Sequence, residues 1–426
     1  MNAKRVLILA ATTGYQTRSF GEAASKLGVE LVFGLDRCRG LDDPWGDHSL
    51  AVRFYDDPRS VEAIVSAAAD GPVAGIIALG DRPTELAGRA AIALGLPFHS
   101  PEAARISRNK LETRRAMCAA GLTVPAFLSA DIDDDAVALA SRVPYPCVVK
   151  PLGLSGSRGV IRADDAAAFA SAFNRIRHIL RSPDVTAMKD PALSQILIEG
   201  FIPGMEFAVE GLMHNGAFDV LAIFDKPDPL DGPFFEETMY VTPSEGDPSS
   251  QQRMVDAITA AAVAIGLSHG SVHAECRVNR AGVFVLEVAA RPIGGLCARA
   301  LRFVRAGADL MSFEELLLRH ALGEDVRACR REPCAAGVMM IPIPRAGVYR
   351  GVAGVDQACG IAGVDEVIIT AKADQHLVPL PEGASYLGFI IARAGRPGLV
   401  VDALRSAHGR LRFDIDRELP LASRQR

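Results

Sequence analysis

The chain has 426 residues, 49% of them hydrophobic, and a formal net charge of −5 at pH 7. This length and composition allow several hydrophobic cores, which predicts two to four domains. The basic excess typical of proteins that bind nucleic acids or membrane surfaces is missing, so neither partner is expected. No apolar run reaches the roughly 18 residues that span a bilayer. The N-terminal apolar stretch is short and breaks at Thr12, Thr13 and Gly14, as a first buried strand would, so we expect a cytoplasmic protein.

The arrangement of cysteines and lysines narrows the chemistry. The eight cysteines are scattered, and the closest two, Cys329 and Cys334, lack the second pair that a zinc site needs. We therefore expect reduced cysteines that serve as small core residues. The chain has 39 arginines but only seven lysines. Each lysine therefore suggests a role that arginine does not fill, which directs attention to Lys110, Lys150 and Lys226.

Residues 1–100 alternate short apolar runs with helical patterns. The runs RVLILA, VELVFGL and AGIIAL occupy 5–10, 29–35 and 74–79, and helical patterns cover about 16–27 and 83–94. This alternation predicts βαβ units and a parallel sheet that is covered on both faces.

From about residue 105 the pattern becomes mixed. A charged helical pattern precedes the buried strand PCVVK, and residues 151–159, PLGLSGSRG, form a glycine- and serine-rich loop between strands. An alanine-rich helix, a strand-rich segment, a second helix and a hairpin are predicted at about 164–180, 205–243, 250–266 and 270–290.

The last hundred residues predict a smaller α+β domain. A helix is expected near 310–322, and the run ACRREPC that follows it is typical of a linker. Strands are then expected near 336–343, 365–371 and 386–393, and a helix near 398–408.

The hairpin at 270–292 places two glutamates opposite each other. Its two strands are joined by the loop 280–282, and a three-residue loop commonly ends in a left-handed residue, which suits the final glycine. With Asn279 opposite Val283, Glu275 lies directly across from Glu287. Strand alternation then places the following residues on one face: His273, Glu275, Arg277, Val285, Glu287, Ala289 and Arg291.

Two carboxylates whose Cβ atoms lie about 5 Å apart destabilise a sheet unless a positive group lies between them. Mg²⁺ is the natural candidate, because one or two carboxylates commonly hold it while phosphates and waters complete the octahedron. The hairpin alone leaves a second interpretation open, in which each glutamate forms an ion pair with Arg277 or Arg291. A register shifted by one residue would remove the opposed pair.

Phosphates bound to such an ion would need further donors. Lys150 ends an apolar strand immediately before Pro151, where a lysine is otherwise hard to explain. The loop that follows offers backbone N–H groups, serine hydroxyls and Arg158, and its glycines allow close approach to an anion. The pattern GxxxxGK[ST] is absent, so a P-loop NTPase is not expected.

Five stretches together resemble the ATP-grasp superfamily. They are NK at 109–110, VVKPLGLSGSRGV at 148–160, ILIEGFIPGMEFAVEG at 196–211, HAECRV at 273–278 and VFVLEVAARP at 283–292. The resemblance covers roughly residues 105–325 and rests on their order and spacing. It implies α/β with α+β architecture: an N-terminal parallel α/β (pre-ATP-grasp) domain at 1–105, a two-lobed ATP-grasp domain at 106–325 with a lid at about 123–195, and a C-terminal α+β domain at 326–426.

The resemblance also implies roles for individual residues. The phosphates and adenine of ATP are expected to contact Lys110 and Lys150, and the mobile phosphate loop contains Ser155, Gly156 and Ser157. The adenine hinge would be Glu199, Phe201 and Ile202, the ribose ligand Glu206, and a lysine that reaches the γ-phosphate Lys226. The magnesium ligands would be Glu275 and Glu287, and Arg291 would bind the substrate carboxylate or the transferred phosphoryl group.

One position departs from the family pattern. Many members carry an asparagine two residues after the second glutamate as a further metal ligand, whereas this chain has Ala289. The expected cofactors are therefore ATP and one or two Mg²⁺ ions, with Mn²⁺ as a substitute.

Within the superfamily the chain resembles the L-amino-acid ligases. The features that carry this resemblance are HAE before the second metal strand, ARPIGG after it, GPFFEETMYVTP, YLGFIIARA and the closing LRFDI. It implies an ADP-forming carboxylate–amine ligase that makes an acyl phosphate and then an amide, with small-molecule substrates and a homodimeric assembly. His273 would position the amine or carboxylate, or else be a packed or hydrogen-bonded histidine, and Gly294 and Gly295 would leave room for a substrate backbone. Phe234 and Phe235 would either shape a side-chain pocket or simply pack, as aromatic residues beside a glycine more often do.

Two other functions stay open at this point. ATP motifs do not distinguish an amino-acid ligase from an ATP-grasp ligase with another carboxylate or acceptor, of the purine-pathway or natural-product type. A nucleotide-binding regulator without turnover is the third possibility, and Ala289 is the feature in its favour.

Overall fold

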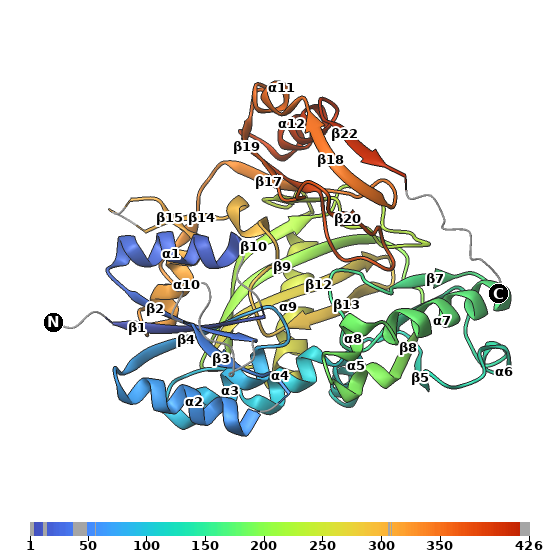
Figure 1. Cartoon of the computed structure of the whole chain (residues 1–426), viewed down its shortest axis with the longest axis horizontal. Coiled ribbons are helices and arrows are strands. Elements are labelled where there is room, and N and C mark those ends of the chain that lie inside the picture. The colour runs from blue at the N-terminus through green and yellow to red at the C-terminus, as the bar shows by residue number, and fades with distance from the viewer. Residues whose placement is uncertain are drawn as a thin grey trace.

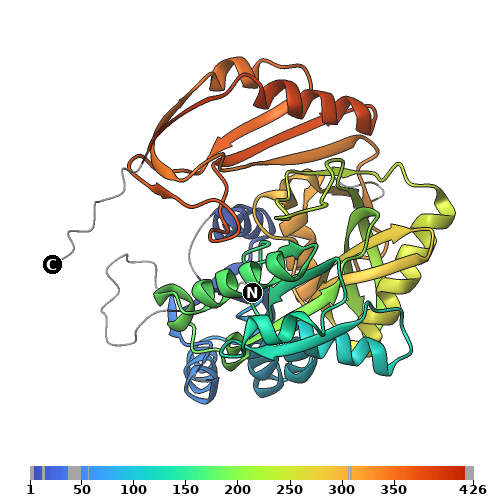
Figure 2. The same cartoon turned by 90° about the vertical axis from the view of Figure 1, so that its right-hand side faces the viewer.

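The computed structural model describes residues 4–11, 15–36, 49–55, 57–305, 307 and 309–417. Thr12, Thr13 and Gly14, where the sequence predicts the end of the first strand, lie outside the described residues. Figure 1 shows the N-terminal sheet in blue, a green lobe on the opposite side of the molecule, and the C-terminal segment in orange and red above both. In the turned view of Figure 2 the C-terminal segment lies across the top of the other parts. No helix in the described ranges combines the length and apolar character that crossing a membrane requires.

The N-terminal segment forms a four-stranded parallel sheet in the order β3-β2-β1-β4, which confirms the predicted parallel α/β arrangement. Its strands and helices are β1 (Arg5–Ala10), α1 (Tyr15–Leu27), β2 (Glu30–Asp36), β3 (Leu50–Val52), α2 (Asp57–Ala69), β4 (Val73–Leu79) and α3 (Thr84–Leu94). Strand β1 is buried on both faces. Leu7 and Leu9 pack in a core with α2 and α3, whereas Val6 and Ile8 face a core shared with α1 and α10 (Phe313–Ala321).

The next segment builds a lobe around its own core. Helices α4 (Pro101–Arg108) and α5 (Lys110–Ala119) lead into a four-stranded antiparallel sheet in the order β5-β8-β6-β7. Its elements are β5 (Phe127–Asp131), α6 (Ala136–Ala140), β6 (Cys147–Pro151), β7 (Ile161–Ala163), α7 (Ala166–Leu180), α8 (Pro183–Thr186), the 3₁₀ helix η1 (Pro191–Ser194) and β8 (Gln195–Gly200). Phe169 and Phe173 of α7 pack against Ile196 and Ile198 of β8 in this core.

An eight-stranded antiparallel sheet runs through the centre of the molecule in the order β13-β12-β9-β10-β11-β17-β21-β19. Its strands are β9 (Met205–His214), β10 (Ala217–Asp225), β11 (Met239–Thr242), β12 (Gly270–Asn279), β13 (Gly282–Ala289), β17 (Ala335–Ile341), β19 (Val364–Ile369) and β21 (Gly388–Ala394). Helix α9 (Pro248–Ile265) packs on the hairpin end, and α12 (Pro397–His408) packs on the end formed by β17 and β21. One continuous sheet therefore joins the segments 205–289 and 335–394.

Two small sheets complete the fold. They contain β14 (Arg302–Val304), β15 (Met311–Ser312) and β16 (Arg330–Arg331), and β18 (Gly347–Ala353), β20 (His376–Leu377) and β22 (Arg412–Asp416), with η2 (Cys297–Ala300) and α11 (Val355–Cys359) between strands. The predicted linker ACRREPC is therefore wrong in part, because Arg330 and Arg331 pair with β14. Strands this short carry no periodic pattern that the sequence could reveal.

Candidate active site

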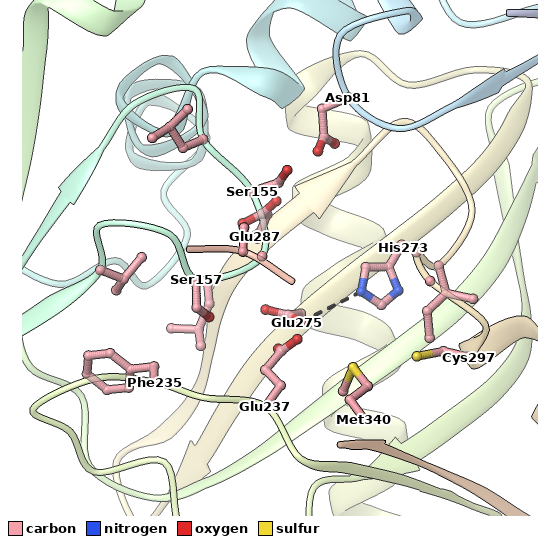
Figure 3. A pocket seen from close by; sticks show the side chains of 18 of the residues that line it. Asp81, Ser155, Ser157, Phe235, Glu237, His273, Glu275, Glu287, Cys297 and Met340 are labelled. Atoms are coloured by element: carbon pink, nitrogen blue, oxygen red, sulfur yellow. Dashed lines mark ion pairs between the residues drawn. The ribbon is translucent and has the colours of Figure 1, made fainter. Parts of the chain in front are cut away.

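A cavity of about 500 Å³ lies where the N-terminal sheet, the lobe, the central sheet and the C-terminal segment meet. It is lined by the predicted site residues except Lys226, Phe234 and Arg158, and also by residues that the sequence did not single out, among them Gln16, Asp81, Glu237, Tyr240, Leu286, Tyr386 and Phe389. Figure 3 shows the carboxylates of Glu237, Glu275 and Glu287 together with His273 inside this cavity. Side chains from segments far apart in the sequence therefore converge on one site.

The hairpin β12–β13 places Glu275 directly opposite Glu287, as predicted. The residue pairs that produce this register differ from the predicted ones. Asn279 pairs with Gly282 rather than Val283, so the loop contains only Arg280 and Ala281. The pairing then shifts between Glu275 and Cys276, because Leu286 is an extra residue on β13. This bulge restores the glutamate pair that the tighter turn would otherwise move out of register.

Two details of the predicted hairpin are wrong as a consequence. Gly282 has φ +136°, not the left-handed conformation near +57° that a three-residue loop would require. Val285 lies on the opposite face from Glu287 and joins the core that contains Cys276 and Val288. The bulge also turns the Leu286 carbonyl toward the guanidinium of Arg114, which donates to it at 2.8 Å.

Glu275 belongs to a cluster of three carboxylates. One oxygen each of Glu206, Glu237 and Glu275 lie within 4.8 Å of one another. The ammonium of Lys226 sits among them and donates to Glu206 at 2.8 Å, to Glu237 at 2.5 Å and to Glu275 at 2.8 Å. The Tyr240 hydroxyl also donates to Glu275, at 3.1 Å. Neither glutamate of the hairpin is paired with Arg277 or Arg291, so the alternative that the sequence left open is not observed in the described structure.

The neighbouring charges in this cluster shift the pKa values of its members. Burial raises the pKa of Glu237 to about 7, and repulsion from the neighbouring Glu275 carboxylate adds to the effect. Burial also opposes ionisation of Glu275, but Lys226 outweighs it and holds the pKa of Glu275 well below its usual range. The pKa of Lys226 itself is raised well above its usual value, because three carboxylates outweigh its burial. A hard divalent cation fits such a set of oxygen donors.

Glu287 faces the phosphate loop and Lys110. Asn109 caps the N-terminus of α5, since its side chain accepts from the backbone N–H of Leu111 at 3.1 Å, and this places Lys110 in the first turn. The Lys110 ammonium donates to the Leu154 carbonyl at 2.8 Å and lies 3.6 Å from Glu287. Lys110 therefore connects the loop to the hairpin.

The loop itself requires glycine. Gly156 and Gly159 have φ +63° and +72°, and Ser157 shares this left-handed conformation at φ +56°. A Cβ on Gly159 would lie 2.8 Å from the ring of Pro151, so the chain can fold back on β6 only with glycine there. Ser155, Gly156 and Ser157 line the cavity.

Lys150 and Glu199 form a buried ion pair, and Glu199 also pairs with Arg114. Burial opposes ionisation of Glu199, but Arg114 and Lys150 outweigh it and lower its pKa to about 2. Burial lowers the pKa of Lys150. Arg114, only 1% exposed, was not predicted to take part in the site, because a helical arginine in a charged pattern gives no sign of burial.

The predicted hinge borders an aromatic part of the cavity. Phe201 and Phe235 lie 6.5 Å apart between ring centroids, and the guanidinium of Arg162 lies over Phe201 at 4.1 Å. Arg277 donates to the Ile202 carbonyl at 2.7 Å and to Glu206 at 2.9 Å. The two oxygens of Glu206, the predicted ribose ligand, are thus engaged by Arg277 and Lys226.

Phe234 lies outside the lining of the cavity in the described structure, unlike Phe235. It forms a β-bridge with Ile161, and the guanidinium of Arg175 lies 4.9 Å from its ring centroid. Phe234 therefore packs against the lobe, which leaves Phe235 to shape the pocket.

Arg291 is held by Asp81, which lies in the loop after β4. Its guanidinium donates to the two carboxylate oxygens at 2.9 and 3.4 Å. Burial opposes ionisation of Asp81, but Arg291 outweighs it and lowers the pKa of Asp81. Asp81 is a residue that the sequence analysis missed. The signal was available, since an acidic residue just after a parallel strand lies at the carboxyl edge where ligands bind.

His273 lies between two carboxylates. Its Nδ1 is 3.0 Å from buried Glu210, and its Nε2 is 3.7 Å from Glu275 (Figure 3). Burial disfavours the protonated ring, but the bonds to Glu210 and Glu275 outweigh it and raise the pKa of His273 to about 9. Glu210 also accepts from the backbone N–H of Ile293 at 3.2 Å, which ties β9 to the segment that carries Arg291.

Gly294 and Gly295 border the cavity but differ in their surroundings. A Cβ on Gly294 would meet no atom within 4 Å, whereas one on Gly295 would lie 3.2 Å from the Phe389 ring. Gly295 also has φ +62°, which disfavours any side chain. Open space is therefore present at the position of a side chain on Gly294 but not on Gly295.

Two family models match separate parts of the chain. The family model described as ATP-grasp domain matches residues 143–300, and the model described as L-amino acid ligase C-terminal domain 2 matches residues 339–416. An L-amino acid ligase structure from Bacillus licheniformis superposes with a TM-score of 0.78 at 24% identity, covering 97% of this chain and 99% of that one. An N5-carboxyaminoimidazole ribonucleotide synthetase from Thermotoga maritima has a TM-score of 0.65 at 14% identity, covering 97% and 100%.

Two sequence relatives extend this comparison. An uncharacterized protein, y4rH, from Sinorhizobium fredii (strain NBRC 101917 / NGR234) is 24% identical over 92% of this chain and 79% of its own length. An alanine–anticapsin ligase from Bacillus subtilis is 26% identical over 65% of this chain and 62% of its own length. The chain thus spans less than two thirds of that ligase.

These matches support an ATP-dependent ligase with an ATP-grasp domain at residues 143–300. Residues 339–416 match the C-terminal domain 2 of L-amino acid ligases, and the fold of the whole chain is similar to that of an L-amino acid ligase.

Proposed function

We propose that this chain activates the carboxylate of an amino acid as an acyl phosphate, using ATP and Mg²⁺, and couples it to an amine. ADP and phosphate are released. The observation that carries the proposal is the convergence of opposed glutamates, two lysines, a glycine–serine loop and a fixed arginine on one cavity. Such a site supplies positioning and charge neutralisation, which phosphoryl transfer to a carboxylate needs more than it needs a covalent nucleophile.

ATP would lie between the lobe and the central sheet. In this proposal Lys110, Lys150 and the loop 155–157 bind its phosphates, and the hinge with Phe201 and Ile202 faces the adenine. The buried network around Glu199 fixes Lys150, and Glu206 lies toward the ribose. The contacts of Lys226 favour neutralisation of the carboxylate cluster over a direct bond to the γ-phosphate.

Glu275 and Glu287 would hold Mg²⁺, and the adjacent Glu237 offers a further carboxylate where Ala289 offers no ligand. Bound there, the ion neutralises phosphate charge that develops during transfer. The proposal allows one or two Mg²⁺ ions, with Mn²⁺ as a substitute.

The proposed reaction has two steps, and each conserves atoms and electrons. A carboxylate oxygen of the substrate attacks the γ-phosphorus, and the bond to the ADP oxygen breaks. The amine then attacks the acyl carbon, phosphate leaves with the C–O electron pair, and the amine nitrogen gives up a proton. Arg291 binds the carboxylate or the phosphoryl group, and His273, held by Glu210, orients the amine or carboxylate. Space for the substrate backbone lies beside Gly294.

The test is release of ADP and phosphate from ATP and Mg²⁺, screened against single amino acids and amino-acid pairs, with product masses recorded. We expect amino-acid-dependent release and a product one water lighter than the summed pair. Glu287→Gln should abolish turnover while the circular dichroism spectrum is retained. The matched variant Glu366→Gln, on β19 and outside the cavity lining of the described structure, should keep full turnover.

Other outcomes point to the other functions. Release only with a carboxylate that is not an amino acid would move the chain to another group of ATP-grasp ligases. ATP binding without release in every mixture would indicate a nucleotide-binding regulator. Turnover that survives in Glu287→Gln would contradict the proposed metal ligands.

A further inference from the structure

A cluster of three histidines lies away from the active site. His214 ends β9, His269 precedes β12, and His320 lies in α10. The ring centroids of His214 and His320 are 4.5 Å apart, those of His269 and His320 4.5 Å, and those of His214 and His269 6.3 Å. None of the three lines the cavity described above. Three segments distant in sequence thus place their imidazoles together.

Five polar atoms of this cluster are buried and make no hydrogen bond in the described structure, although two of them, His214 Nε2 and Asp219 Oδ2, lie close enough for an ion pair. They are Nε2 of His214, Nδ1 and Nε2 of His269, Nε2 of His320 and Oδ2 of Asp219. Asp219 belongs to the same place, since its Oδ2 lies 3.4 Å from His214 Nε2. A buried polar atom without a hydrogen bond destabilises the folded state, and native proteins rarely leave several together. The concentration of such atoms points to a ligand.

The ring of His320 lies beside the Met213 carbonyl, and Nε2 of His320 makes no hydrogen bond in the described structure. A histidine that donates one nitrogen to a carbonyl presents the lone pair of the other, as metal-bound histidines commonly do.

We propose that His214, His269, His320 and Asp219 form a binding site for one divalent transition-metal ion of the zinc class. Three imidazoles and one carboxylate are a ligand set that Zn²⁺ binds in tetrahedral geometry, whereas Mg²⁺ prefers oxygen donors. The site is independent of the proposed ligase reaction. It fastens the β9–β10 turn, the start of β12 and α10 to one another.

The ligand atoms of the cluster do not yet converge, because no three of its residues place one ligand atom each within 4.8 Å of one another in the described structure, so side chains must turn when an ion binds. With Zn–N bonds of about 2.0–2.1 Å, three imidazoles around a tetrahedral ion have centroids roughly 5 Å apart. The observed separations of 4.5, 4.5 and 6.3 Å bracket this distance. His269 is stacked on His320 with 23° between the planes, so its ring turns when the ion binds. No described group holds either nitrogen of His269 in its present orientation.

An ion can reach this site from solvent. The side chain of Asp219 is 43% exposed and that of His214 is 16% exposed, whereas His320 is buried. Oδ2 of Asp219, which faces the histidines, is buried, whereas the rest of that side chain is exposed, so Asp219 would lie between solvent and the imidazoles.

The test uses the full chain without a polyhistidine tag, stripped of metal with a chelator. Zn²⁺ is titrated by calorimetry, and Co²⁺ is added as a spectroscopic probe of tetrahedral geometry. We expect one ion per chain, a tetrahedral Co²⁺ spectrum and a higher melting temperature with Zn²⁺. His320→Asn keeps a side-chain N–H near the Met213 carbonyl but deletes Nε2, and His269→Asn removes a ring that forms no described hydrogen bond. Each variant should weaken Zn²⁺ binding by more than about 100-fold. Loss of a group that only hydrogen-bonds to a metal ligand costs at most about 100-fold in affinity, so a larger loss indicates that the ligand itself was removed.

Two controls separate this site from others. Glu287→Gln alters the proposed magnesium site, and His178→Asn alters an exposed histidine of the lobe. Both should bind Zn²⁺ like the unmodified chain. The proposal is overturned if the stripped chain binds no Zn²⁺ at micromolar concentration, or if binding persists in both histidine variants. Loss of binding in Glu287→Gln alone would assign the ion to the active site and overturn it as well. If His320→Asn does not fold, His269→Asn decides the question by itself.

Discussion

At the scale of single residues, the charged groups of the site are fixed by partners that lie far away in the sequence. Asp81 and Arg291 are 210 positions apart, yet they form a nearly bidentate pair at 2.9 and 3.4 Å. A bidentate carboxylate sets the plane of a guanidinium as well as its position. Asp81 thus orients Arg291 without itself needing to touch the substrate.

Asp81→Asn should therefore lower activity through substrate positioning. The amide keeps one acceptor but loses the charge, so Arg291 is held less firmly. We expect kcat/KM for the carboxylate substrate to fall about 10- to 100-fold, since small displacements of a positioning group have effects of this size. The KM for ATP should change little. Asp57→Asn, which breaks the pair with Arg89 outside the cavity, is the control and should leave both constants unchanged. An equal loss in the two variants would contradict the role of Asp81.

Gly295→Ala and Gly294→Ala should separate backbone strain from substrate space. At Gly295 a methyl group meets the Phe389 ring at 3.2 Å and is forced into a left-handed conformation, which costs about 1–2 kcal/mol. Calorimetric melting should show Gly295→Ala to be less stable than the parent and Gly294→Ala to be equally stable. If substrate backbone lies beside Gly294, that variant loses activity at full stability. Equal stability of the two variants would show that the strain argument is wrong.

At the scale of elements, the glycine–serine loop is held by a segment of the C-terminal part of the chain. The backbone N–H of Gly159 donates to the Pro381 carbonyl at 2.9 Å, and Arg158 donates to the Glu382 carbonyl at 2.7 Å. Arg175 of α7 pairs with the Glu382 carboxylate at 2.5 and 2.9 Å. The segment between β20 and β21 therefore bears directly on the loop that is proposed to hold phosphates.

Glu382→Gln should loosen this contact. The pair with Arg175 is partly exposed, so its loss costs little stability, about 1 kcal/mol or less. We expect the KM for ATP to rise a few-fold while kcat and the melting temperature change little. Asp416 of β22 forms a comparable exposed ion pair with Arg350 of β18, away from the lobe. Asp416→Asn breaks this pair and should leave the KM for ATP unchanged. An unchanged KM in Glu382→Gln would show that the segment packs on the lobe without influencing the loop.

At the scale of the whole molecule, buried histidines couple stability to pH. His99 lies in the segment between α3 and α4 and bonds to the backbone before and within β12, at 3.2 Å to the Ser268 N–H and 3.1 Å to the Ser271 carbonyl. Burial lowers the pKa of His99 from 6.5 to about 4. His214, His269 and His320 have lowered pKa values for the same reason.

These groups predict loss of stability in mild acid. In the unfolded chain His99 binds a proton below about pH 6.5, whereas in the folded chain its pKa is about 4. The unfolded state therefore binds more protons between these values, so the free energy of unfolding falls as the pH falls from about 6.5 to about 4. Each such histidine contributes a slope of about 1.4 kcal/mol per pH unit. Denaturant unfolding at several pH values should show a shallower slope for His99→Gln than for the parent. His178→Gln, at an exposed position, should leave the slope unchanged, and an equal slope in all three proteins would contradict the prediction.

Local patterns in the sequence determined much of the site. The strand pair with its two glutamates, the glycine–serine loop and the lysines beside them all lie within short segments whose alternation and turn residues are visible directly. The order of strands and helices likewise determined the parallel N-terminal sheet. These features depend on interactions between residues a few positions apart, so a short stretch of sequence is enough to predict them.

Tertiary packing decided the rest. It brought Asp81 to Arg291, enclosed Lys226 among three carboxylates, and carried one sheet from the hairpin at 270–289 into the C-terminal strands. Even the correct glutamate pair depends on a bulge at Leu286, whose carbonyl is held by Arg114 from another element. Such contacts join residues that no period or turn relates, because packing free energy in the folded molecule, and not local conformational preference, selects them.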